Sequence, residues 1–126
     1  MPMFEFHGRK FPYLVTKGWW RFVNFDISNM NLTSLDGLPR CMQVEYDFNC
    51  SNNFLTSLAG MPDDLEVGGN FNCSNNLLVD FNELPTYFKI CGSFYCTSNP
   101  LCELLGSGLS TLPENILAGR TIRKVF

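Results

Sequence analysis

The amino-acid sequence predicts a small solenoid, mostly β, in which short coils of chain stack around a shared hydrophobic core. Three observations predict it. A phenylalanine recurs every 23 residues, at Phe25, Phe48, Phe71 and Phe94. A cysteine follows the last three of these phenylalanines by two residues, and an asparagine follows them by five. A unit this short cannot bury a core alone, so each coil has to pack against its neighbours.

The composition is consistent with one globular domain and narrows the function. The chain has 126 residues, of which 45% are hydrophobic, and its formal net charge is -3. It carries no basic stripe with interleaved aromatic residues, so we expect no nucleic-acid partner. It has no apolar run of about 18 residues, so we expect no membrane partner. Residues 1–10 lack the apolar core of a signal peptide, which favours a cytoplasmic protein.

Each coil is expected to contribute one strand around its phenylalanine. Because side chains alternate along a strand, Phe71 and Cys73 should point inward while Asn70 and Asn72 point outward. Coils stacked about 4.8 Å apart would then form one curved parallel sheet. The return segments are short and carry Leu-Pro or Met-Pro, so we expect extended or 3-10 backbone on the convex side.

A ladder of buried amides is expected to hold the bend of each coil. Its members are Asn53, Asn76 and Asn99. Their side chains can bond backbone groups that have no regular sheet partner at a bend. Met30 occupies this position in the first coil, so the ladder should begin at the second coil.

The repeated cysteines are expected to fill the core. Cys50, Cys73 and Cys96 form a predicted inward column of small buried side chains. A straight stack presents collinear thiols, whereas a structural metal needs tetrahedral ligands, and His7 is the only histidine. We therefore predict no metal site. Because residues 1–10 carry no export signal, all six cysteines are expected to be reduced, and a disulfide among Cys41, Cys91 and Cys102 stays open as the alternative.

The central block of the repeat reads Phe71-x-Cys73-x-x-Asn76-x-Leu78, followed by Leu84-Pro85. This pattern resembles the consensus of the leucine-rich-repeat family, and the resemblance covers roughly residues 22–126. Two sequence motifs of the chain, Cys-Ser-Asn-Asn and Leu-Thr-Ser-Leu-x-Gly-Leu-Pro, are similar to those of short-coil repeat proteins of bacteria and bacteriophages. The resemblance implies a leucine-rich-repeat solenoid, and in a phage or bacterial setting a protein that binds and modulates a host defence protein.

The open ends of a coil stack need caps. Residues 1–21 are rich in aromatic side chains and are expected to cover the first coil, partly as a strand or hairpin. Residues 22–126 would form the solenoid, with about four coils and a capping strand near residues 122–126. The last Leu-Pro arrives five residues late, which predicts an insertion at residues 105–110.

No motif in the sequence indicates catalysis. The patterns Cys-x-x-Cys, His-Glu-x-x-His and Gly-x-Ser-x-Gly and the phosphate-binding loop are all missing from the chain. The acidic cluster of Asp63, Asp64 and Glu66 is interpreted as a solvated turn. We therefore predict a protein that is not an enzyme and uses no cofactor.

The outward positions of the predicted strands form a polar, mildly acidic face that is the first candidate for binding a protein. Tyrosines supply rigid contact area, and the acidic neighbours favour a basic patch on the partner. The predicted partner-binding residues are Asp26, Tyr46, Asp47, Asn49, Asn70, Asn72 and Tyr95, with Trp20 as an anchor in the cap. Two alternatives stay open, which are glycan or cell-surface binding by this face and a homo-oligomer that pairs through an edge or the aromatic cap.

Overall fold

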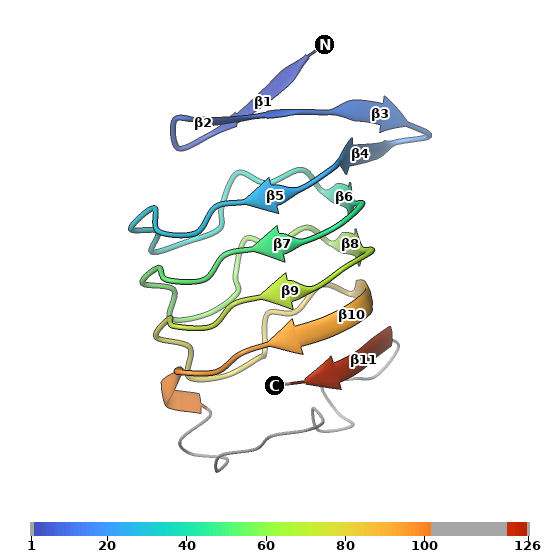
Figure 1. Cartoon of the computed structure of the whole chain (residues 1–126). Helices are drawn as coiled ribbons and strands as arrows, with labels where there is room; N and C mark the ends of the chain where they lie inside the picture. Colours follow the sequence, from blue (N-terminus) through green and yellow to red (C-terminus); the bar gives the residue numbers. More distant parts are fainter. Residues whose placement is uncertain (1, 102–120, 126) are drawn as a thin grey trace.

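The computed structural model describes residues 2–101 and 121–125 and is a β-solenoid of roughly three turns with coils of about 23 residues. Figure 1 shows the coils stacked one below another, with the N-terminal strands at one end and β11 at the other. The predicted solenoid and its parallel sheet are thereby confirmed. The strands of the described residues are β1 (Met3–Phe6), β2 (Arg9–Pro12), β3 (Leu14–Thr16), β4 (Trp19–Phe22), β5 (Phe25–Asp26), β6 (Cys41–Val44), β7 (Phe48–Asn49), β8 (Asp64–Val67), β9 (Phe71–Asn72), β10 (Tyr87–Tyr95) and β11 (Thr121–Val125).

Each coil contributes two strand segments to the sheet, where the sequence had predicted one. The first limb of the sheet contains β4, β6, β8 and the start of β10, and the second limb contains β5, β7, β9 and the end of β10. Because β10 runs unbroken through both limbs, they form one sheet, and Figure 1 shows the chain turning between β6 and β7 and between β8 and β9. Only the second limb was predicted. In the last three coils the first limb follows Leu-Pro or Met-Pro, where the sequence predicts a return segment.

The return segments, residues 27–40, 50–63 and 73–86, consist of turns, bends and irregular backbone. None of these three segments contains the 3-10 helix that was one predicted form of the convex side. The chain enters each return through a residue with positive φ, at Asn29, Asn52 and Asn75 (φ 55–56°). Asparagine tolerates this conformation better than most residues, which explains its recurrence there. No helix in the described part of the chain is long and apolar enough to cross a membrane.

The phenylalanines form a continuous spine through the core. The ring centroids of Phe25, Phe48, Phe71 and Phe94 are 5.3, 5.0 and 5.3 Å apart in order, and all four side chains are fully buried. Beside the spine, the thiols of Cys50, Cys73 and Cys96 are also fully buried. Burial raises the pKa of the Cys50 thiol to about 12, so this side chain stays neutral and packs as a small apolar group.

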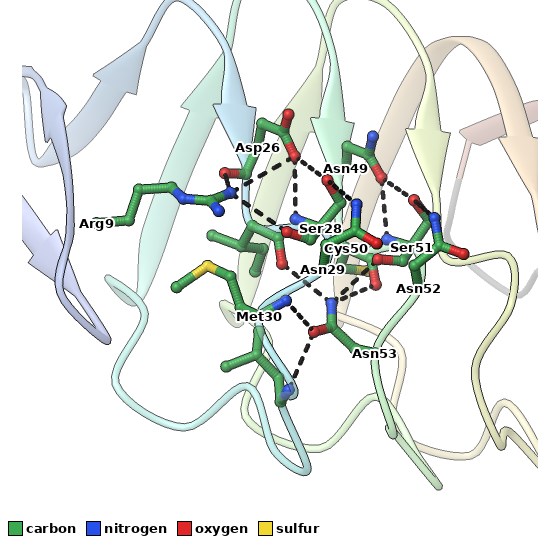
Figure 2. A network of polar contacts seen from close by, with 12 residues as sticks. Arg9, Asp26, Ser28, Asn29, Met30, Asn49, Cys50, Ser51, Asn52 and Asn53 are labelled. Carbon is green, nitrogen blue, oxygen red and sulfur yellow. Dashed lines mark hydrogen bonds and ion pairs between the residues drawn. The ribbon is translucent and has the colours of Figure 1, made fainter.

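The asparagine ladder ties each bend to the coil above it. The Asn53 Nδ2 donates to the carbonyl oxygens of Ile27 and Cys50 at 3.0 Å, and its Oδ1 accepts from the backbone N–H groups of Met30 and Leu32 at 3.0 Å (Figure 2). Asn76 and Asn99 repeat the two donated bonds one and two coils further on, and their Oδ1 atoms accept from the backbone N–H groups of Leu55 and Leu78. The ladder begins at the second coil, because Met30 has no amide to extend it.

Two hairpins cover the first coil. Phe6 and Phe11 of the β1–β2 hairpin join the core, where Phe11 stacks on Phe25 at 4.3 Å between ring centroids. The strand β3 pairs antiparallel with β4, and β4 pairs parallel with β6. The parallel pairing therefore begins at Trp20, which lies opposite Met42.

Arg9 of this cap takes the place of a missing coil. In the second coil, the carbonyl oxygens of Asn49 and Ser51 accept from the N–H groups of the coil above. The first coil has no coil above it. Instead, the Arg9 guanidinium donates to the carbonyl oxygens of Asp26 (2.7 Å) and Ser28 (3.4 Å), as Figure 2 shows. Unpaired carbonyl groups at a sheet edge can accept hydrogen bonds from a strand of another chain. The hydrogen bonds of Arg9 satisfy two of these carbonyl groups.

At the other end, β11 continues the sheet. It pairs parallel with β10, with Lys89 opposite Thr121 and Ile90 opposite Ile122. These partners are 32 residues apart, compared with 23 between Glu66 and Lys89. The predicted insertion at residues 105–110 lies outside the described residues.

Candidate functional site

A ladder of polar and charged side chains follows the outer face of the first limb. In β6 and β8, buried residues alternate with half-buried ones, so one side chain of each pair points away from the core. The register places four such residues side by side, one from each coil. These outer-ladder residues are Arg21, Gln43, Glu66 and Lys89.

A groove with a cavity volume of about 600 Å³ lies along this ladder. Its lining includes all four outer-ladder residues together with Glu45, Gly68 and Cys91 from the bend between the two limbs. At the cap end it is lined by Pro12, Tyr13 and Leu14, which lie at the junction of β2 and β3. Because every coil contributes residues at equivalent positions, the groove crosses the strands and follows the axis of the stack.

The charges of the groove change sign twice along that axis. Arg21 lies on the first coil, Glu45 and Glu66 on the next two, and Lys89 on the fourth. The ion pairs of the described residues join Arg9 to Asp26 and Arg40 to Asp63, and so involve none of these four. The groove therefore has a negative centre between two positive ends, with charges that are free to meet a ligand.

Glu66, at the centre of the groove, is held by two neutral donors. The Gln43 Nε2 donates to its Oε1 at 2.9 Å, and the Tyr87 hydroxyl donates to its Oε2 at 3.1 Å. Desolvation of the Tyr87 hydroxyl and its hydrogen bond to Glu66 both raise the Tyr87 pKa, so Tyr87 remains a donor. A carboxylate offers about four lone-pair positions, so Glu66 can still accept from a ligand.

An aromatic pair lies beside Glu66 on the next outward column. The Trp19 and Tyr87 rings meet edge to face, with centroids 6.3 Å apart and an interplanar angle of 76°. The Cys41 thiol of the same column donates to Asp64 Oδ2 at 3.5 Å, and burial together with Asp64 raises the Cys41 pKa. This corner thus places a half-buried indole (Trp19) and an exposed phenol ring (Tyr87) beside the carboxylates of Glu66 and Asp64, a combination that suits a cation.

The bend that borders the groove is fixed by a second ladder of side chains. The Oδ1 atom of Asn24 accepts from the N–H of Asp47 at 3.2 Å, and those of Asp47 and Asn70 accept from the next coil at 2.8 Å. A Cβ added to Gly69 would lie 2.6 Å from the Tyr46 carbonyl oxygen and would also collide with the Asp47 carboxylate. Only glycine allows the coils to approach so closely here, so this border of the groove is well defined.

The predicted partner-binding residues lie elsewhere, on the second limb, the bend and the cap. The Oδ1 atoms of Asp26, Asn49 and Asn72 accept from the N–H group two residues further on at 2.9–3.0 Å, which closes the turn that ends each coil. Asp47 and Asn70 belong to the bend ladder just described.

The three predicted aromatic contacts are also separated from one another. Tyr46 is 54% exposed at the bend, and Tyr95 is half-buried at the end of β10. The Trp20 ring stacks on Tyr13 with centroids 4.5 Å apart, and it packs against the core. None of the eight predicted residues lines the groove, and their role in binding stays a prediction.

Sequence reasoning missed the outer ladder because it placed no strand between residues 41 and 44 or their equivalents. A usable signal was present. The triplets Met42-Gln-Val44, Leu65-Glu-Val67 and Phe88-Lys-Ile90 are 23 residues apart and alternate apolar and polar side chains. The groove itself had no such signal, since residues 12–14 reach it from the cap.

The fold and the groove together define a class, a short capped β-solenoid with an open groove along one limb of its sheet. Comparisons of the chain with protein families, with curated proteins and with solved structures find no match. Its function is therefore inferred from the site alone.

Proposed function

We propose that this protein is a non-enzymatic binding module that holds an extended segment of a partner protein in the groove of the first limb. The groove is the observation that carries the proposal. It spans four coils, or about 14 Å at a strand spacing of about 4.8 Å, which accommodates an extended segment of five to six residues. Both its floor and its border are fixed by hydrogen bonds, so little entropy is lost on binding.

The chemistry of the lining supports binding rather than catalysis. The groove contains carboxylates, an amide, two cationic side chains and the exposed thiol of Cys91. His7 lies outside it, and the described residues contain no cluster of three histidine, cysteine or acidic side chains that could hold a metal ion. The hydrogen bonds of the described residues do not pair the Cys91 thiol with a base.

The finer assignments rest on the sequence resemblance. We propose that the coils are a variant of the leucine-rich repeat, with the phenylalanine column in place of a leucine column. We also propose that the partner is a host protein of a bacterial defence system and that both meet in the cytoplasm. The support for this partner is the similarity of the repeat motifs to those of bacterial and bacteriophage proteins. The groove itself does not favour one partner protein over another.

The proposal is tested by selecting peptides from a random displayed library on the wild-type protein. The selected peptides are then measured against Gln43→Trp, which fills the centre of the groove, and against Thr56→Trp, which places the same side chain on an exposed return segment. Thermal unfolding of both variants checks that they fold. We expect the peptides to bind Gln43→Trp at least about tenfold more weakly, a loss of about 1.4 kcal/mol, and to bind Thr56→Trp as they bind the wild type.

Two outcomes would refute the proposal that the groove binds a segment of a partner protein. Peptides that bind all three proteins equally would place the site elsewhere, with the second limb as the next candidate. A glycan array that gives groove-dependent binding, when no peptide is selected, would favour the glycan alternative.

A further inference from the structure

We infer that the partner segment carries one basic residue between two acidic residues, with the wider of the two intervals at the cap end of the groove. The inference rests on the proposed function and specifies the chemistry of its ligand. It follows from the order of charges along the groove, from the aromatic corner that lies beside Glu66 and from the spacing of the coils.

The centre of the groove is built for a cation. Glu66 and Asp64 are neighbours on the face of β8, and neither has a cationic partner among the described residues. Gln43 and Tyr87 orient the Glu66 carboxylate, so it need not reorganise when a ligand arrives. Trp19 and Tyr87 add ring faces that attract an ammonium or guanidinium group.

The ends of the groove are built for anions. Arg21 lies on the coil next to the cap and Lys89 on the fourth coil, and both side chains are exposed. Neither forms an ion pair within the described residues. Arginine presents a planar fork that matches a carboxylate with two parallel hydrogen bonds, and lysine presents a point charge.

The spacing of these charges sets the spacing of the ligand. Arg21 and Glu66 are two coils apart, or about 10 Å, and Glu66 and Lys89 are one coil apart, or about 5 Å. An extended chain advances about 3.3 Å per residue, so the first interval corresponds to three residues and the second to between one and two.

Net charge alone would not produce this preference. The protein has a net charge of -3, so a ligand with two acidic residues is repelled at long range. Binding of such a ligand in preference to one with the same charges in another order therefore reports on the local arrangement in the groove.

The test compares two hexapeptides of identical composition and net charge, blocked at both ends: Glu-Ser-Ser-Lys-Ser-Glu and Lys-Ser-Ser-Glu-Ser-Glu. Binding to the full-length protein is followed by NMR shifts of the Trp19 indole. We expect the first peptide to bind at least about fivefold more tightly at low salt, with the difference shrinking at about 1 M salt. Glu66→Gln should reduce the preference below about twofold, whereas Glu83→Gln, at an exposed return position, should leave it unchanged.

Equal affinities of the two peptides, or no binding of either at about 10 mM, would overturn the inference, as would a preference that survives Glu66→Gln. The library selection separates this failure from failure of the proposed function. Groove-dependent peptides without the acidic-basic-acidic order would leave the proposed function standing and the inference wrong. If the library yields no groove-dependent peptides, the proposed function itself fails.

Discussion

Replacing the ladder asparagines with alanine should destabilise the protein by amounts that differ from one rung to the next. Asn53 and Asn76 are equally buried, each 5% exposed, and both amide groups donate to three carbonyl oxygens. They differ in what they accept. The Asn53 Oδ1 accepts from two backbone N–H groups, those of Met30 and Leu32, whereas the Asn76 Oδ1 accepts from Leu55 alone.

The magnitude follows from the groups left without a partner. A buried N–H that loses its acceptor costs about 1–3 kcal/mol, and each further hydrogen bond contributes about 0.5–1.5 kcal/mol. The Cys50 carbonyl oxygen accepts from both asparagines, so each substitution leaves it one donor. We therefore expect Asn76→Ala to lower the free energy of unfolding by about 3–4 kcal/mol, and Asn53→Ala to lower it by about 1 kcal/mol more.

Equilibrium unfolding in urea measures both values, and the slope of the transition checks that the surface exposed on unfolding is unchanged. Asn82→Ala is the control, because Asn82 is exposed on a return segment, and it should stay within about 0.5 kcal/mol of the wild type. If Asn76→Ala proves as costly as Asn53→Ala, or if either is as mild as Asn82→Ala, counting orphaned N–H groups is the wrong account of the ladder.

Three further predictions concern the cap, the bend and the core. Arg9→Ala uncovers the carbonyl edge of the first coil, so we expect a loss of about 1 kcal/mol and concentration-dependent association by light scattering; Lys10→Ala should show neither, and a monomeric Arg9→Ala would contradict the capping role. Gly69→Ala forces a Cβ against the Tyr46 carbonyl oxygen and should cost more than about 2 kcal/mol in urea, and a neutral result would show that the bend can open. The pKa of Cys50 is raised to about 12 in the fold from 9.0, so unfolding releases a proton above pH 9; stability should be constant below pH 9 and fall as the pH rises toward 12, less steeply in Cys50→Ala.

The sequence could predict those parts of the fold that repeat. Phe48 and Phe71 mark the coil period because a fully buried column accepts few residue types, and Asn76 marks the bend because only an amide supplies donors and an acceptor at once. The first limb was harder to predict, because its outward residues are unconstrained by the core and differ in every coil. The four outer-ladder residues occupy equivalent positions in their coils, but their side chains differ in charge and in chemical type.

The candidate site could not be predicted for a different reason. Its lining joins Leu14 of the cap to Lys89 of the fourth coil, which are distant in the sequence and are brought together only by the stacking. The role of Arg9 was equally hidden, since it depends on a coil that does not exist. The predicted face does not coincide with the groove. Polar residues such as Asn49 and Asn72 stabilise their own turns, because their side chains accept a hydrogen bond from the N–H group two residues further on.

Because Arg9 bonds the carbonyl groups that another coil would otherwise bond, the cap can close a stack with any number of coils. Neighbouring coils meet through the same register at every step, so a duplicated copy of residues 48–70 would find matching partners above and below. Such an insertion would extend the groove by about 4.8 Å and add one more carboxylate to its centre. Tandem duplication within the gene would therefore lengthen the recognised segment in fixed steps, and the same N-terminal cap would cover the first coil of each longer protein.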